Sequence, residues 1–293
     1  MKKIIFAFVY IFAIYSCNLE LEEEISWQLD EYPNMLVVES IITNETKQQA
    51  VLLTVTSDYF DKGKPIGVKN AEVTVSDGNN VYNFTESDTI EGLYLSDNMF
   101  ACIPLQTYQL SITLDKPING STEYSAESYM HEGIAIDSLS CELYELPEID
   151  MRDKDSSTVR DTTILAIYYF GQEPEYVGNY YLSKTFLNNK PLQNGPKEYY
   201  IQNDKYQNGN YTHINAHIVN VSDGDTVMFR LFSIERSFYN YIDAIQLIDN
   251  TGSSFSMCGP PANATGNISG GKALGFFAAS YVSEKTGIVA DRR

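Results

Sequence analysis

The chain has 293 residues, and its 39 acidic residues outnumber its 20 basic ones, which gives a formal net charge of -19 at pH 7. This balance argues against nucleic acid as a partner, because phosphate binding needs a basic stripe that the sequence does not contain. Aromatic residues make up 13% of the chain, and 22 of them are tyrosines. Together with short runs of β-branched residues and a single helical pattern, they predict a mostly-β protein.

The first segment, residues 1–17, predicts a lipoprotein signal peptide. Two lysines precede an apolar run from Ile4 to Tyr15, which is too short to span a bilayer. A small residue, Ser16, stands directly before Cys17, which suits processing in which the cysteine thiol is acylated and becomes the new N-terminus. We therefore predict lipidation of Cys17. The alternative is an ordinary signal peptide in which this cysteine is incidental.

Residues 18–34 follow the predicted lipid and open with an acidic stretch over 20–24. We expect a solvated, extended tether here. Acyl chains on Cys17 would hold the protein stably at the outer membrane, since each buried methylene contributes about 0.8 kcal/mol. The acidic stretch is similar to the signals that follow the lipidated cysteine in surface-exposed lipoproteins of Bacteroidetes. We therefore expect display on the cell surface, with the periplasmic face as the alternative.

Residues 35–130 show a series of short strands separated by turns. The expected strands are 36–43, 49–56, 71–76, 81–84, 92–94, 108–114 and 124–128. Asp77, Gly78 and Asn79 supply turn chemistry between two of these strands and predict a hairpin. About seven short strands with turns at this spacing favour an immunoglobulin-like or transthyretin-like β-sandwich.

A domain boundary fits near 130–133, and residues 134–293 are predicted to form a second, antiparallel β domain with one helix. The expected strands are 138–146, 162–170, 213–221, 226–232 and 273–282. The charged segment 147–161 is interpreted as an exposed hairpin loop. Apolar residues at spacings of three and four predict a helix over about 233–250, with Ser233 as its cap and Gly252 just past its end.

The cysteines leave two interpretations open. Once Cys17 carries lipid, three remain, so at most one disulfide can form. Cys102 and Cys141 are the candidate pair, which would leave Cys258 over. Otherwise the cysteines are small buried hydrophobic residues.

The sequence contains little material for a metal site or a catalytic centre. His213 and His217 lie four residues apart on an expected strand, which separates them by about 13 Å at ~3.3 Å per residue and prevents joint ligation. No G-x-S-x-G nucleophile motif occurs. The oxygen-rich segments 77–80 and 222–225 suit turns better than calcium loops, which need six or more oxygen ligands. We expect no catalytic residue, no metal and no cofactor.

Tyrosines crowd between Tyr168 and Tyr241. Adjacent tyrosines on a strand point to opposite faces, so one member of each pair is expected to be exposed. Exposed tyrosines give rigid contact area with a polar tip, which suits a peptide, a glycan or a partner protein. The alternative is β-propensity on a solvated sheet. The candidate contact residues are Tyr168, Tyr180 and Tyr199.

The segment 259–275 is rich in small and turn-forming residues. It is either a long turn before the last strand or a loop that contacts a partner such as a transporter rim. Its candidate contact residues are Gly259, Pro260, Pro261 and Asn263.

Several of these segments carry a resemblance to a known family. The residues concerned are Leu36–Thr43, Ala71–Asp77, Gly92, Tyr94, Gly259–Asn263, Gly270, Gly271 and Leu274–Phe277. In these positions the chain resembles a Bacteroidetes lipoprotein family catalogued as domain of unknown function 4249. The resemblance implies a lipid-anchored outer-membrane protein with an N-terminal β-sandwich that serves alongside TonB-dependent transporters, and it implies no catalytic residues.

We therefore expect a non-enzymatic accessory or ligand-binding subunit in nutrient uptake, which captures a peptide or glycan or hands it to a TonB-dependent transporter. The first alternative is a structural or adhesive surface protein without a small ligand. An enzyme of unknown class is the second alternative.

Overall fold

The computed structural model describes residues 34–56, 65–145, 163–175, 177–205, 208–218, 221–252 and 264–290. The predicted signal peptide with Cys17, and the tether as far as residue 33, lie outside the described residues. So do the charged segment 147–161, Cys258 and the four candidate contact residues of the 259–263 stretch. The fold below is that of the described part of the chain.

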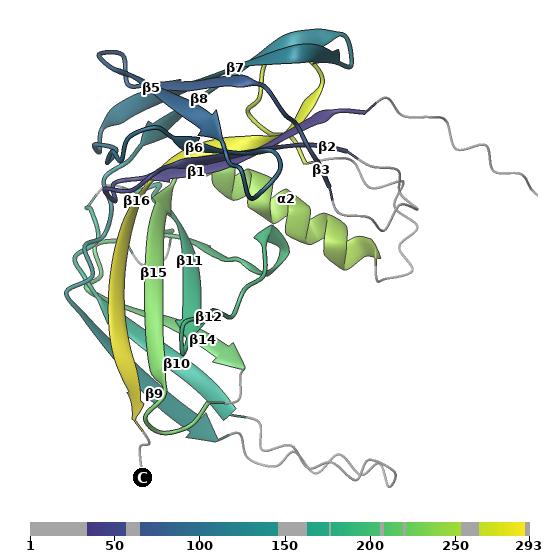
Figure 1. The fold of residues 1–293 in the computed structure, drawn as a ribbon. Coiled ribbons are helices and arrows are strands. Elements are labelled where there is room, and N and C mark those ends of the chain that lie inside the picture. Colours follow the sequence, from purple (N-terminus) through teal and green to yellow (C-terminus); the bar gives the residue numbers. More distant parts are fainter. Residues whose placement is uncertain are drawn as a thin grey trace, which may run out of the picture. The chain divides into compact units, whose positions relative to one another are not determined.

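The fold is mostly β, as predicted, with one α-helix in the described residues (Figure 1). This helix is α2 (Arg236–Gly252), and a short 3-10 helix, η1 (Pro196–Glu198), precedes it. The first group of strands is β1 (Leu36–Thr43), β2 (Ala50–Val55), β3 (Ile66–Gly67), β4 (Glu72–Ser76), β5 (Val81–Glu86), β6 (Leu93–Ser96), β7 (Gln106–Ile118) and β8 (Ser121–Met130). The strands that we predict in this region are all present.

The first group forms a single antiparallel sheet that folds over on itself. Its order is β1-β2-β6-β5-β4-β7-β8, with β3 paired to β2. The alternating apolar residues of these strands point inward and fill one core, which includes Val38, Val73, Tyr94 and Leu110. The layers therefore pack as a β-sandwich, because every second side chain of each strand faces the same interior.

The predicted hairpin between β4 and β5 turns at Asp77. The Asp77 carboxylate accepts hydrogen bonds from the backbone N–H groups of Asn79 (2.9 Å) and Asn80 (2.6 Å) and from the Tyr82 hydroxyl (3.0 Å). Burial raises the pKa of this carboxyl, but the hydrogen bonds from Asn80, Asn79 and Tyr82 outweigh it and lower the pKa to about 2. The oxygens of this segment thus serve the turn.

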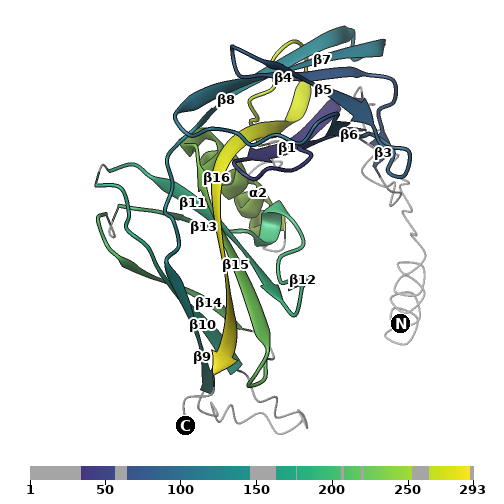
Figure 2. The same cartoon turned by 60° about the vertical axis from the view of Figure 1, so that its left-hand side comes forward.

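The last strand, β16 (Ala273–Ala290), is longer than predicted and changes partner along its length. Its residues 273–280 pair in parallel with β1, and its residues 281–288 pair antiparallel with β15 (Thr226–Ile234). Its end pairs in parallel with β9 (Ser138–Glu145). Figure 2 shows this yellow strand running from the first sheet to the strands of the second group. The described residues on both sides of the predicted boundary at 130–133 belong to one compact unit.

The second group of strands encloses another core. The strands β9, β10 (Thr163–Phe170) and β14 (Thr212–Ile218) form one layer, and β11 (Tyr180–Leu187), β15 and β16 form the other. The short strands β12 (Lys190–Pro191) and β13 (Tyr200–Asn203) pair with β11. Leu165, Tyr169 and Phe229 fill the space between the layers. The antiparallel pairing of β9 with β10 agrees with the hairpin that we expect around 147–161.

The predicted start of the helix is wrong by three residues. Ser233 lies in β15, where its backbone pairs with Tyr181 and Tyr281, so it does not cap α2. The strand continues through Ile234 because both faces of its last residues are buried. Gly252 is the last residue of the helix rather than the first residue beyond it.

The candidate disulfide pair, Cys102 and Cys141, is not joined in the structure. Both thiols are free and buried, and they belong to different cores, Cys102 to the first sheet and Cys141 to the second group of strands. Burial raises the pKa of Cys102 to about 12 and that of Cys141 to about 11. The alternative interpretation, small buried hydrophobic residues, describes them correctly.

Polar side chains fill the point where β16 leaves β1 and meets β15. The Asn44 side chain accepts a hydrogen bond from the Val282 N–H (2.6 Å) and donates one to the Val282 carbonyl (3.2 Å). The Glu45 carboxylate pairs with Arg230 of β15 (2.5 Å), and Arg230 also contacts Glu284 of β16 (3.1 Å). The loop after β1 is thereby fixed to the second group of strands.

The pairing of β1 with β16 predicts a strict requirement for glycine at position 275. Gly275 has a φ of +94°, and a Cβ atom there would lie 1.9 Å from the Val38 carbonyl oxygen. We expect Gly275→Ala to lower the free energy of unfolding by about 3 kcal/mol or more, or to prevent folding, because backbone atoms must move. Urea unfolding monitored by circular dichroism measures this loss.

Gly78→Ala is the matched control. Gly78 has a similar φ of +87°, but a Cβ atom at this turn would have nothing within 4 Å. We expect a loss of only about 1 kcal/mol from backbone strain. Equal losses of unfolding free energy in the two variants would show that the close approach of β1 to β16 does not cause the requirement for glycine at position 275.

Candidate functional site

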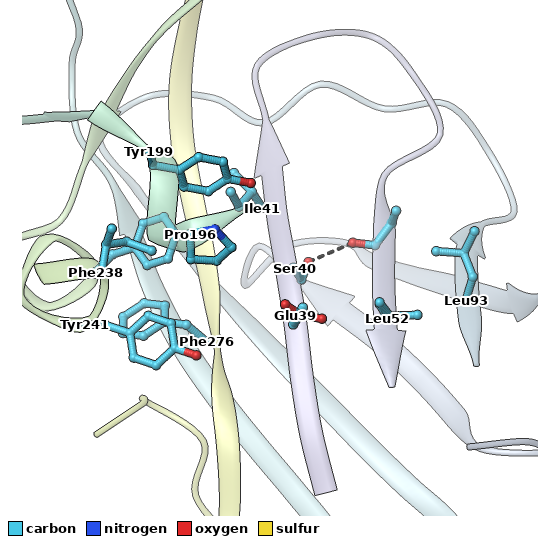
Figure 3. A pocket seen from close by; sticks show the side chains of 12 residues that line it. Glu39, Ser40, Ile41, Leu52, Leu93, Pro196, Tyr199, Phe238, Tyr241 and Phe276 are labelled. Atoms are coloured by element: carbon cyan, nitrogen blue, oxygen red, sulfur yellow. Dashed lines mark hydrogen bonds between the residues drawn. The ribbon is translucent and has the colours of Figure 1, made fainter. Parts of the chain in front are cut away.

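An apolar cleft lies between the outer face of the first sheet and the helix α2, and we call it the aromatic cleft (Figure 3). Its volume is about 350 Å³. Its lining residues are Glu39, Ser40, Ile41, Ala50, Leu52, Leu93, Pro196, Tyr199, Phe238, Tyr241, Ile242 and Phe276. A cleft of this size is within the range of small-ligand sites.

One wall of the aromatic cleft is formed by strand β1, whose side chains alternate between the two faces of the sheet. Leu36, Val38 and Ile42 of β1 point into the first core, so Glu39 and Ile41 face the opposite side, toward α2. Leu52 and Leu93 of the neighbouring strands continue this wall. The Ser40 hydroxyl donates to the Ala50 carbonyl (2.8 Å), which ties β1 to β2 along the cleft floor.

The opposite wall consists of aromatic rings from α2 and β16. Phe238 and Tyr241 lie three residues apart and therefore project from one face of the helix. The Phe276 ring packs against both of them, with centroid distances of 4.8 Å to Phe238 and 5.3 Å to Tyr241. In Figure 3 these rings gather on one side of the cleft, across from Glu39 and Leu52.

The turn that carries Tyr199 is fixed by the helix. The Gln246 side chain donates hydrogen bonds to the carbonyl oxygens of Pro196 (3.1 Å) and Tyr199 (2.7 Å). The Lys184 ammonium lies 4.4 Å from the centroid of the Tyr199 ring, a cation–π distance. Burial lowers the pKa of Lys184 to about 8, with Arg230 and Lys47 adding to the effect. Gln246 thus holds the Tyr199 backbone, and Lys184 lies over the Tyr199 ring.

Besides the Ser40 hydroxyl, which is bonded to Ala50, the polar side-chain groups that line the cleft are one carboxylate and two phenols. Burial raises the pKa of the Tyr199 and Tyr241 hydroxyls, and the negative charge of Glu39 raises both further. Both phenols therefore stay protonated at neutral pH and can donate hydrogen bonds. Glu39 is exposed and adds an acceptor on the strand wall of the cleft. The cleft can hold a ligand that has apolar faces and hydroxyl groups at its edges.

The structure places the three predicted contact tyrosines in two different regions. Tyr199 lines the cleft, and Tyr180 packs with Tyr239 of α2 next to the same aromatic cluster (5.0 Å between centroids). Tyr168 lies on β10, in the other layer of the second group.

The prediction of one exposed member in each adjacent tyrosine pair is clearly confirmed for one pair of three, because Tyr168 and Tyr180 are only half-buried. Tyr169 is fully buried beside Tyr168, and Tyr181 is buried beside Tyr180. In the third pair Tyr200 is the exposed residue, with 41% of its surface accessible, and Tyr199 faces the cleft.

Most residues of the cleft are not among the contact residues predicted from the sequence. Glu39 belongs to the predicted apolar strand 36–43, and Phe276 belongs to the apolar run of the last predicted strand. Neither residue was therefore predicted to contact a ligand. A usable signal was the pair Phe276–Phe277, because adjacent large apolar residues on a strand require cover on both faces of the sheet. Phe277 fills the first core, and Phe276 meets the helix.

His213 and His217 lie on a strand, as predicted. The His213 ring is buried and stacks on Tyr169 with 5.0 Å between centroids, and burial lowers its pKa. Over the described ranges, no group of three or more His, Cys, Asp or Glu side chains could hold a metal ion. No described helix has the length and hydropathy needed to cross a bilayer.

Comparison with known proteins identifies the family. The profile of DUF4249, a domain of unknown function, matches residues 22–286. The chain belongs to the DUF4249 family. No curated protein matches it. One similar solved structure is a DUF4785 family protein from Legionella pneumophila subsp. pneumophila str. Philadelphia 1, with 9% identity and a TM-score of 0.25. The match covers 68% of this chain and 52% of that one, so this chain spans about half the length of the Legionella protein.

Proposed function

We propose that this DUF4249 protein is a lipid-anchored binding protein of the bacterial outer membrane, which takes its ligand in the aromatic cleft. The observation that carries the proposal is the cleft itself, where Tyr199, Phe238, Tyr241 and Phe276 surround about 350 Å³ beside one exposed carboxylate. On this proposal the protein serves nutrient uptake and passes the ligand to a TonB-dependent transporter.

The chemistry of the cleft suits a short glycan. Sugar rings have apolar faces that can lie against aromatic side chains, and their hydroxyl groups can reach the Glu39 carboxylate and the two phenols. Phe238 and Phe276 pack against each other, and Gln246 fixes the backbone of Tyr199, so little ordering is needed when the ligand enters. A peptide with apolar side chains is the competing ligand, and the binding test separates the two.

The lining of the cleft supports binding rather than bond cleavage. Glycoside hydrolysis ordinarily uses two carboxyl groups on opposite sides of the sugar bond. The described lining residues offer Glu39 as their one carboxylate, with no histidine or cysteine beside it. We therefore propose a non-enzymatic subunit.

The cleft predicts that Tyr199 and its neighbour Tyr200 differ sharply in their effect on binding. Saturation-transfer NMR of the full chain in detergent with a mixture of maltotriose, xylotriose, chitotriose and Leu-Gly-Leu identifies the ligand class. We expect at least one trisaccharide to receive saturation. Tyr199→Ala should weaken its binding about tenfold or more, because about 1.4 kcal/mol of ring contact is removed.

Tyr200→Ala is the matched control, because Tyr200 is adjacent in the chain and exposed away from the cleft. We expect its affinity to stay within about twofold of the unmodified protein. Saturation of the tripeptide alone, or equal losses in both variants, would contradict a glycan site in the cleft.

The envelope part of the proposal predicts that Cys17 determines membrane attachment. In cells fed radiolabelled palmitate, the full chain should take up label and sediment with membranes, and Cys17→Ala should do neither. Cys102→Ala is the control, since Cys102 is buried in the first core, and it should keep both properties. Label in the Cys17→Ala variant would overturn the anchor.

A pull-down of the full chain from membranes tests the uptake role. Recovery of a large β-barrel in equal amounts with the full chain supports the uptake role, whereas its absence supports the adhesive alternative.

A further inference from the structure

Lys184, on strand β11, has no anionic partner among the residues that the structure describes. Its side chain is half-buried, yet no ion pair or hydrogen bond within the described ranges includes it. By contrast, Lys47, Lys69 and Arg230 each pair with a glutamate. The chain has 39 acidic residues and only 20 basic ones, so a carboxylate partner for Lys184 would be easy to supply. An unpaired ammonium in this position therefore needs an explanation.

Lys184 lies on the face of the sheet that borders the aromatic cleft. Leu182 stands two residues earlier on the same strand, so both side chains point to the same face. Leu182 belongs to the core cluster that contains Phe238 and Phe276, two aromatic residues of the cleft. The Lys184 ammonium lies 4.4 Å from the centroid of the Tyr199 ring, which also lines the cleft. Lys184 is thus next to the cleft, at its Tyr199 end.

The charged groups around Lys184 do not neutralise it. Arg230 of β15 lies directly opposite Lys184 in the pairing of β11 with β15, and like charges in directly opposite positions destabilise a sheet. Arg230 pairs with Glu45 and Glu284, and Lys47 also pairs with Glu45. These three cations and two carboxylates leave one positive charge, which is that of Lys184. An anion bound here would offset both the repulsion and the cost of burying an ammonium.

Two aromatic rings complete the surroundings of this ammonium. It lies 4.4 Å from the centroid of the Tyr199 ring and 5.3 Å from that of the Phe232 ring. These contacts stabilise the cation but bring no negative charge. Burial, with Arg230 and Lys47 adding to it, lowers the pKa of Lys184 to about 8, so the amine is still mostly charged at pH 7. Its flexible four-carbon stem can turn the three N–H donors toward a ligand.

An acidic sugar suits the cleft and Lys184 together. A glycan that lies against the aromatic rings of the cleft would place one sugar unit beside Tyr199. A carboxylate or sulfate on that unit would be within reach of Lys184, because the ammonium contacts the same ring. The charges that shift the pKa of Lys184 are those of Arg230 and Lys47, and Glu39 is not among them. The carboxylate of the cleft and this ammonium therefore serve different parts of a ligand.

We propose that the ligand of the aromatic cleft is an acidic glycan, whose anionic group pairs with Lys184 beside the Tyr199 ring. This inference rests on the proposed function, because it requires that a glycan enters the cleft. It adds the charge of the ligand and the residue that recognises this charge. The anionic group is either the carboxylate of a uronic acid or a sulfate ester, and the binding test distinguishes the two.

The test is isothermal titration of the full chain in detergent with acidic trisaccharides and their neutral counterparts. One pair is trigalacturonate and its uncharged triamide, and the other is 6-O-sulfated chitotriose and chitotriose. We expect at least one acidic member to bind about tenfold or more tightly than its neutral counterpart at pH 6.5. An advantage for trigalacturonate indicates a uronic acid, and an advantage for the sulfated sugar indicates a sulfate ester.

The affinity of the preferred acidic trisaccharide should depend on pH. It should fall about fivefold between pH 6.5 and pH 9, because Lys184 loses most of its charge over this range. The pKa values of Tyr199 and Tyr241 are raised, so both phenols of the cleft stay mostly protonated at pH 9. Binding of the neutral counterpart should therefore change little.

Two lysine variants locate the contact. Lys184→Met removes the charge but keeps an unbranched apolar stem against the Tyr199 ring, and it should abolish the advantage of the acidic trisaccharide. Lys190→Met is the matched control, because it removes one positive charge from the exposed strand β12, and its affinities should stay within about twofold. Circular dichroism checks that both variants fold, and the pH comparison in the unmodified protein tests the proposal even if Lys184→Met does not.

Three results would overturn the proposal: equal binding of acidic and neutral members, equal losses in Lys184→Met and Lys190→Met, or an affinity for the acidic trisaccharide that does not fall with rising pH. If neutral trisaccharides still bind through Tyr199 in such a case, the proposed function stands and the charge of the ligand is wrong. If no trisaccharide binds at all, the proposed function fails as well.

Discussion

The parallel pairing of β1 with the first half of β16 is the contact on which the rest of the structure depends. It places the last strand of the chain beside the first, and the same strand then continues antiparallel to β15. Phe277 thereby enters the core of the first sheet, while Phe276 points to α2 on the other side. The aromatic cleft has walls from both ends of the sequence, so it exists only when this pairing has formed.

Much of the strand content follows from the sequence, because alternating apolar residues and turn residues act locally. Each of these elements is predicted from a few neighbouring residues: strand β4 from the alternation of Val73 and Val75, the hairpin from the turn at Asp77, and the helix from the apolar spacing around Phe238. Strand partners cannot be obtained in this way. Nothing near Ala273 indicates a parallel neighbour more than 200 residues earlier in the chain, and nothing near Cys102 and Cys141 shows that they lie in different cores.

The aromatic cleft differs from the sequence prediction because the fold decides which side chains meet. Tyr199 was a reasonable candidate because tyrosines are useful contact residues, yet its neighbour Tyr200 looked equivalent until the fold assigned them opposite sides. Glu39 could not be distinguished from 38 other acidic residues, because its place opposite the aromatic rings comes from segments that meet only in the folded protein. Charge and aromatic content therefore indicate binding in general, whereas the fold indicates where.

Native-state hydrogen exchange of β1, β15 and β16 tests most directly whether β16 unites the two groups of strands. If it does, amides of β1 such as Val38 and amides of β15 such as Phe229 should exchange through one shared opening, with equal free energies and equal dependence on denaturant. Opening of β1 at a clearly lower free energy, while β15 and the second half of β16 stay protected, would show two independent units and contradict this account.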